Sequence, residues 1–131
     1  MTLKKITIHA VASALFAGMA CIIYNSIYNT AMYLSFAKVI NIGGMLGACI
    51  FASVLMALGY YLGFKWKSEK ALPWINIIIV IVSFASIIGV LGFTLPLDVE
   101  SPEMFPGLAI PMHFFPALAF LALAPFFKYR A

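Results

Sequence analysis

The sequence predicts an all-α, polytopic membrane protein: a four-helix transmembrane bundle that forms one domain over residues 1–131. Composition, charge placement and the lack of alternating polarity predict this class. The chain is 65% hydrophobic and 9% charged, with a mean hydropathy of +1.09. A soluble domain carries roughly 25% charged residues. We therefore expect the lipid bilayer to solvate much of the surface, and the few dispersed cations give no reason to expect nucleic acid as a partner.

The charged residues divide the chain into four uncharged stretches, at 6–37, 39–64, 71–97 and 104–127. Each is longer than the about 20 residues that cross a hydrocarbon core of about 30 Å. Backbone groups within lipid must pair inside the protein, which favours helices. A β-barrel strand would alternate in polarity, and the run 77–82 does not. We expect helices at about 6–29, 40–64, 72–94 and 107–127, an inner loop at 65–71 and outer loops at 30–39 and 95–106.

The distribution of lysine and arginine predicts the orientation. Seven basic residues fall on one side of the bundle: Lys4, Lys5, Lys65, Lys67, Lys70, Lys128 and Arg130. The other side has Lys38 together with Asp98, Glu100 and Glu103. Because basic residues are retained on the cytoplasmic side, we predict a multi-pass protein of the cell membrane, in bacteria the inner membrane, with both termini in the cytoplasm. The first apolar run also resembles a signal peptide, but it continues past Cys21 to Ile27, and we expect it to be retained.

The predicted helix 40–64 carries a stripe of small residues within about 100° of arc at 3.6 residues per turn. The stripe consists of Gly44, Ala48, Ala52, Gly59 and Gly63. Small residues allow membrane helices to approach closely. We therefore expect this helix to be the most closely packed. Its stripe contacts either neighbouring helices of the chain, which we favour, or a second copy or another membrane protein.

The predicted helix 107–127 contains Pro111 and Pro116, which we expect to kink it. A proline within a helix leaves the carbonyl four residues earlier without its hydrogen bond, so the carbonyls of Gly107 and Met112 need other partners. His113 lies between the prolines, and an ionisable residue inside a membrane indicates a functional site by default. The interpretation we favour is nevertheless a neutral structural histidine that bonds Asn25, Asn41, a serine or a freed carbonyl.

The acidic outer loop offers a second candidate feature. Asp98, Glu100 and Glu103 with His113 would be a feasible cation site, but their spacing matches no known motif. A solvated loop, or an ion pair between Lys38 and Asp98 or Glu100, is the interpretation we favour. The predicted ligand-binding residues are His113, Asn25, Asn41, Asp98 and Glu100.

Several chemistries find no support in the sequence. Cys21 and Cys49 are lone cysteines without a CxxC pattern and are interpreted as small buried apolar residues. His9 and His113 fall in opposite halves of the bundle, so they do not form a haem ligand pair. We predict no metal, no cofactor and no catalytic residue.

One segment has a resemblance to a known family. Asn41-Ile42-Gly43-Gly44-Met45-Leu46-Gly47-Ala48 resembles the glycine-rich first-helix motif of small fluoride channels, which are also four-helix proteins. Phe51 stands where that motif has arginine, the motif falls on the second helix here, and the family's pore motif is missing. We assign no family.

Three functions follow from these observations. The first is a non-enzymatic accessory or structural subunit that acts through helix packing. The second is a transporter or channel for a small solute, with an outer vestibule around His113. The third is a membrane enzyme acting on lipid or quinone, with His113 as the base and Asp98 or Glu100 orienting it. The lack of a nucleophile–base pair favours a protein that is not an enzyme.

Overall fold

The computed structural model describes residues 3–127 and 129, without the side chains of 67 and 68. It contains four long helices: α1 (Leu3–Met32), α2 (Ile42–Lys67), α3 (Leu72–Leu91) and α4 (Phe105–Phe127). Short 3-10 helices, η1 (Ser68–Ala71) and η2 (Pro102–Met104), precede α3 and α4. No strand occurs in the described part. All four helices are long and apolar enough to cross a membrane, and even α3 spans about 30 Å at 1.5 Å per residue. The predicted helix ends agree with these bounds to within three residues.

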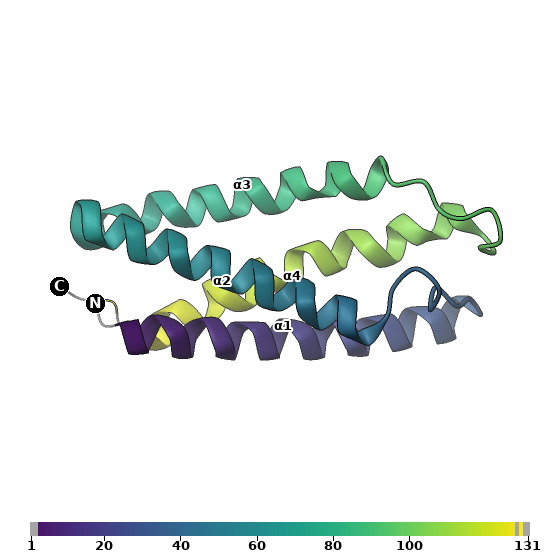
Figure 1. Cartoon of the computed structure of the whole chain (residues 1–131), viewed down its shortest axis with the longest axis horizontal. Helices are drawn as coiled ribbons and strands as arrows, with labels where there is room; N and C mark the ends of the chain where they lie inside the picture. Colours follow the sequence, from purple (N-terminus) through teal and green to yellow (C-terminus); the bar gives the residue numbers. More distant parts are fainter. Residues whose placement is uncertain (1–2, 128, 130–131) are drawn as a thin grey trace.

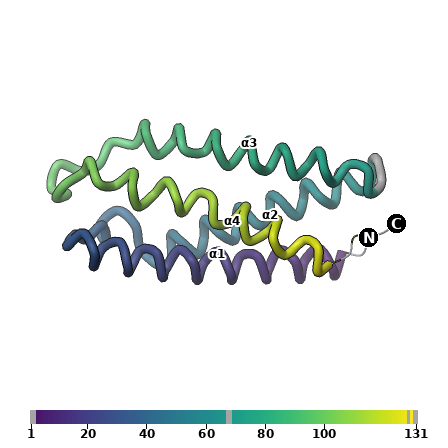
Figure 2. Tube along the Cα trace, turned by 180° about the vertical axis from the view of Figure 1, so that it is seen from behind, coloured from purple at the N-terminus to yellow at the C-terminus, as the bar shows by residue number. Residues whose placement is uncertain are grey.

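The helices run up and down, and two of them cross between the other two (Figures 1 and 2). α1 and α3 form opposite edges and make no contact, while α2 and α4 pass between them. α1 packs along both α2 and α4, so 44% of its most apolar segment is buried, against 28% for α2 and 11% for α3. The expectation that α2 would be the most closely packed helix is therefore wrong. Its small residues do not all meet a neighbouring helix.

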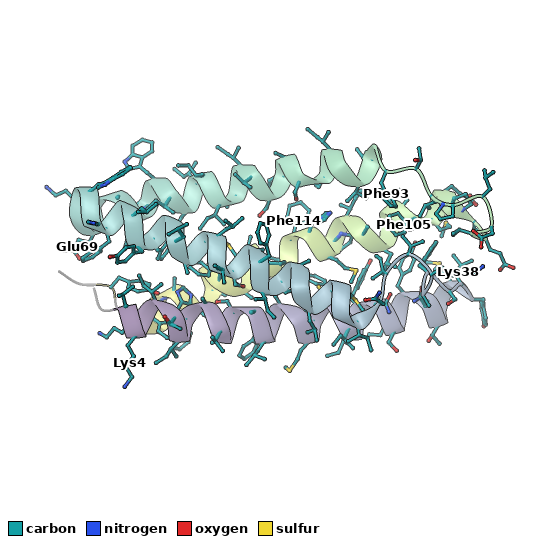
Figure 3. The ribbon with its side chains drawn as sticks, viewed as in Figure 1. Lys4, Lys38, Glu69, Phe93, Phe105 and Phe114 are labelled. Carbon is teal, nitrogen blue, oxygen red and sulfur yellow. The ribbon has the colours of Figure 1, made fainter. Side chains whose placement is uncertain are left out.

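The two ends of the bundle differ in charge. The start of α1 and the α2–α3 connection share one end, and the connections 33–41 and 92–101 share the other, as the labels of Lys4, Glu69 and Lys38 show (Figure 3). We call these the basic end and the acidic end. At the basic end, Trp66 and Trp74 are 78% and 70% exposed, which is typical of tryptophans at a membrane interface.

Each end has its own apolar core. The acidic-end core is built from Ala17, Cys21, Phe36, Met45, Cys49, Val90, Phe105, Leu108, Ala109 and Met112. The basic-end core is built from Ile6, Ala10, Ala57, Tyr60, Ile79, Ala117 and Phe120. Phe105 connects the first core to both loops, with ring centroids 5.5 Å from Phe36 and 6.1 Å from Phe93 (Figure 3).

His9 closes the basic-end core. Its ring is fully buried and stacks on Phe120 and Phe127, with centroids 4.0 Å and 4.6 Å away. Nε2 lies 2.8 Å from the carbonyl oxygen of Phe120, and Nδ1 lies 2.6 Å from the hydroxyl of Tyr129. A carbonyl only accepts, so Nε2 carries the proton and Nδ1 accepts from the tyrosine. This neutral histidine attaches the end of α4 to the start of α1.

The proline-rich helix α4 continues through Pro111 and Pro116 and bends near its middle (Figures 1 and 2). Side chains of α1 reach the two carbonyls that these prolines leave free. The Tyr24 hydroxyl donates to the carbonyl of Gly107 at 2.8 Å, and the Cys21 sulfur lies 4.0 Å from that of Met112. An unpaired carbonyl in an apolar interior is costly, so these contacts stabilise the irregular helix.

Candidate functional site

A cavity of about 690 Å³ lies between α2, α3 and α4. Its size is within the range of about 300–1,000 Å³ found for small-molecule sites. α2 and α3 are close at the basic end and diverge towards the acidic end (Figure 1), and the cavity occupies the space between them. Most of its wall is aliphatic. The wall includes Leu55, Met56, Ile75, Ile78, Ile79, Val82, Met112, Pro116 and Ala117.

The small-residue stripe of α2 forms one wall of this cavity. Gly44, Ala48, Ala52 and Gly59 all line it. Gly63, the last member of the stripe, instead faces α3, where an added Cβ would collide with the side chain of Ile75. The stripe thus lets α3 approach α2 closely at the basic end, and the rest of the stripe borders open space. Whether a partner helix packs on Gly44, Ala48 and Ala52 stays a prediction.

Four polar side chains, Asn41, Ser83, Ser86 and His113, reach the cavity wall, and two of them make hydrogen bonds within the chain. Ser86 donates to the carbonyl of Ser83 at 2.7 Å, within α3. Asn41 precedes α2 and accepts from the backbone N–H of Gly44 at 2.7 Å, which is the usual role of an N-cap asparagine. The side chains of Asn41 and Ser86 are therefore engaged in hydrogen bonds with the backbones of α2 and α3.

His113 and the Ser83 hydroxyl make no hydrogen bond with any described residue. His113 is the ionisable one of the two: it lines the cavity and its side chain is exposed. The structural interpretation, in which Asn25, Asn41, a serine or a freed carbonyl bonds this histidine, is thus not seen. A neutral imidazole has one donor and one acceptor nitrogen, and both are free for a molecule that enters the cavity.

The other predicted ligand-binding residues lie elsewhere. Asn25 accepts from Asn29 on the next turn of α1 at 3.1 Å and does not line the cavity. Asp98 forms an ion pair with Lys38 at 2.6 Å, and Glu100 is exposed in the same loop. The structure therefore brings His113 and Asn41 to one cavity and leaves Asn25, Asp98 and Glu100 out.

The ion pair between Lys38 and Asp98 is one of the interpretations that the sequence favoured, and it joins the two connections of the acidic end. The bound ammonium lowers the pKa of the Asp98 carboxyl, and the carboxylate raises the pKa of Lys38. No hydrogen bond joins His113 to Asp98 or Glu100, so the enzyme hypothesis loses its orienting group. Among the described residues, no three His, Cys, Asp or Glu side chains gather closely enough to hold a metal ion.

Sequence reasoning missed the pairing of Cys21 with Cys49. The two sulfurs lie 3.7 Å apart, both side chains are buried, and both line the cavity. The sequence gives no clear signal for this pair, because Cys21 lies 11 residues before the end of α1 and Cys49 lies seven residues after the start of α2. Whether the two side chains face one another also depends on how each helix is rotated.

A second hollow of about 640 Å³ runs along α1 and α2, and its wall is almost entirely apolar. It is lined by Leu3, Ile6, Thr7, Ala10, Val11, Ala14, Leu15, Leu46, Ile50, Val54, Ala57, Leu58 and Tyr61. Tyr61 is the one ionisable group among these lining residues.

Comparison with known proteins adds no assignment: no family model, no curated protein and no solved structure matches the chain.

Proposed function

We propose that this chain is a multi-pass membrane protein that binds and transports a small solute, mainly apolar and with one hydrogen-bonding group, in the cavity between α2, α3 and α4. The observation that carries the proposal is His113, an imidazole that lines the cavity and has no hydrogen-bond partner among the described residues. A polar group held in a lipid-embedded helix costs free energy unless it is satisfied. A solute that hydrogen-bonds His113 would recover that cost.

The composition of the wall supports the class of solute. Aliphatic side chains and the bare backbone of the small-residue stripe surround most of the space. Binding sites of this kind gain affinity from apolar contact and orientation from a few polar groups. His113 supplies the orienting bond, with Asn41 at the rim. The absence of a charged residue from the wall favours a neutral solute.

The proposal includes the orientation. Lys4, Lys5, Lys65 and Lys70 gather at the basic end, and Asp98, Glu100 and Glu103 lie at the acidic end. The positive-inside rule then puts the basic end and both termini in the cytoplasm of a cell-membrane protein. The orientation is tested in intact cells with two single-cysteine variants, Lys70→Cys and Glu100→Cys, each made in a background in which Cys21 and Cys49 are replaced by alanine. We expect a membrane-impermeant maleimide to label the Glu100 position alone, and the reverse pattern would contradict the orientation.

A cavity-filling experiment tests the binding function. Ala48→Phe and Ala52→Phe place a ring in the cavity that His113 also lines, while Ala85→Phe makes the same change on α3 outside the cavity wall. The protein is released from membranes in mild detergent and its bound small molecules are measured by native mass spectrometry. We expect wild type and Ala85→Phe to retain a molecule that Ala48→Phe and His113→Ala lose, with partial recovery in His113→Gln. Equal retention by all variants would contradict the proposal.

An accessory subunit is the second candidate, and one observation favours it. The small residues Gly44, Ala48 and Ala52 face open space, and α3 is mostly uncovered. A partner helix seated there would close the cavity and use the stripe as membrane helices do. Cross-linking from position 48 in membranes separates the two candidates, because a subunit would give one protein adduct of defined mass and a solute-binding protein would not.

A further inference from the structure

Cys21 and Cys49 present two thiols to one another from different helices, α1 and α2. Their sulfurs lie 3.7 Å apart and the side chains are 3% and 2% exposed. A disulfide would require the sulfurs to approach to about 2.0 Å. The observed separation is that of a thiol–thiol contact, and it also suits two ligands of one metal ion. Two sulfurs that share one ion at metal–sulfur distances of about 2.3 Å and lie 3.7 Å apart subtend an angle of roughly 107° at that ion.

That angle is close to tetrahedral and leaves two further positions for ligands. Met45 and Met112 belong to the same buried cluster as the two cysteines, and all four residues also line the cavity. They come from three helices, α1, α2 and α4, so the cluster is formed only by the folded bundle. Two thiols and two thioethers in one apolar core make a sulfur-rich environment without carboxylates.

We infer that Cys21 and Cys49 bind one soft monovalent metal ion, Cu(I), with Met45 and Met112 as the neutral ligands that complete its coordination. Thiolate and thioether sulfur favour soft metals, with Cu(I), zinc and iron–sulfur clusters as the biological examples. Zn²⁺ takes Cys, His and carboxylate ligands, usually four of them in a structural site, and only two are present here. The inference does not depend on whether the cavity binds a solute.

Cu(I) binding at this pair needs no redox partner. When Cu(I) enters, both thiols lose their protons to solvent, because the thiolate is the form of cysteine that binds metal, while the two thioethers bind through lone pairs. The metal keeps its oxidation state. The cavity supplies an approach, since all four sulfur-bearing residues line it.

A competition titration tests the site. The full chain, reduced and purified in detergent without oxygen, is titrated with Cu(I) against a chelator that is coloured when it holds the metal. We expect one equivalent to be withheld from the chelator by wild type. Cys21→Ala and Cys49→Ala should each abolish this, and Met45→Leu and Met112→Leu should weaken it at least tenfold. Met56→Leu is the matched control, because Met56 lines the same cavity but packs against the basic-end core.

Each variant is first shown to keep its helicity and its elution volume, so that loss of binding is not loss of fold. X-ray absorption gives a second readout that does not depend on the variants. A first shell made only of sulfur supports the site, and a first shell of nitrogen or oxygen overturns it. Retention of Cu(I) by both cysteine variants overturns it as well. Equal affinities in the Met45, Met112 and Met56 variants would overturn the four-sulfur ligand set.

Discussion

Replacing His9 tests how the two ends of the chain are held together. His9 is fully buried, makes two hydrogen bonds and stacks on two aromatic rings. His9→Phe keeps a ring in the same space and removes both bonds. At about 1 kcal/mol for each bond, the free energy of unfolding should fall by about 2 kcal/mol. His9→Ala also removes the stacking, worth roughly 0.5–1.5 kcal/mol for each ring pair, so its total loss should be about 4 kcal/mol.

The assay is reversible unfolding in mixed micelles, followed by circular dichroism as a denaturing detergent is added. Tyr129→Phe is the internal control, because it removes the hydroxyl that donates to Nδ1 and nothing else, and it should cost about 1 kcal/mol. Since the two residues share that bond, the losses in His9→Phe and Tyr129→Phe should not add in the double variant. A loss below about 0.5 kcal/mol in His9→Phe, or full additivity, would refute the account of this cluster.

Three further predictions follow from the same contacts. Tyr24→Phe removes the donor to the Gly107 carbonyl and should lower the free energy of unfolding by about 1 kcal/mol. The loss should be smaller in a Pro111→Ala background, because the backbone N–H of residue 111 then bonds that carbonyl. An equal loss in both backgrounds would be evidence against the role of the proline. Gly63→Leu should cost about 1–3 kcal/mol through the collision with Ile75, whereas Gly47→Leu, with nothing within 4 Å of its Cβ position, should be nearly neutral in the same unfolding assay. The ion pair between Lys38 and Asp98 should persist above the ordinary Asp pKa of 3.8 and be lost as pH falls through the lowered pKa of Asp98. In an NMR titration of the Asp98 carboxyl carbon, the midpoint should rise in Lys38→Met. An unchanged midpoint would show that the pair is not formed.

The helix bounds could be predicted from the sequence because the positions of the charged residues, and the lengths of the uncharged stretches between them, indicate where each apolar helix begins and ends. The pairing of Lys38 with Asp98 could be anticipated in the same way, since few charges share that end. The rotation of each helix about its own axis could not be predicted. Apolar residues surround every helix, so no polar face indicates which side is buried.

That missing information accounts for what sequence reasoning overlooked. The Cys21–Cys49 pair and the bonds of His9 both depend on which faces of α1, α2 and α4 meet. The small-residue stripe was interpreted as a packing surface, but most of it lines a cavity, because α2 leans away from α3 towards the acidic end. His113 lines the cavity, and its role there stays a prediction. Of the two carboxylates considered as its neighbours, Asp98 is held by Lys38 and Glu100 is exposed at the surface.

The most direct test of the central claim is an experimental structure of the protein in a lipid nanodisc, purified gently from its own membrane. The account predicts non-protein density between α2, α3 and α4, with an atom within hydrogen-bond distance of a ring nitrogen of His113. An empty cavity, closed by α3 packing onto Gly44, Ala48 and Ala52 with His113 bonded to a protein group, would contradict it.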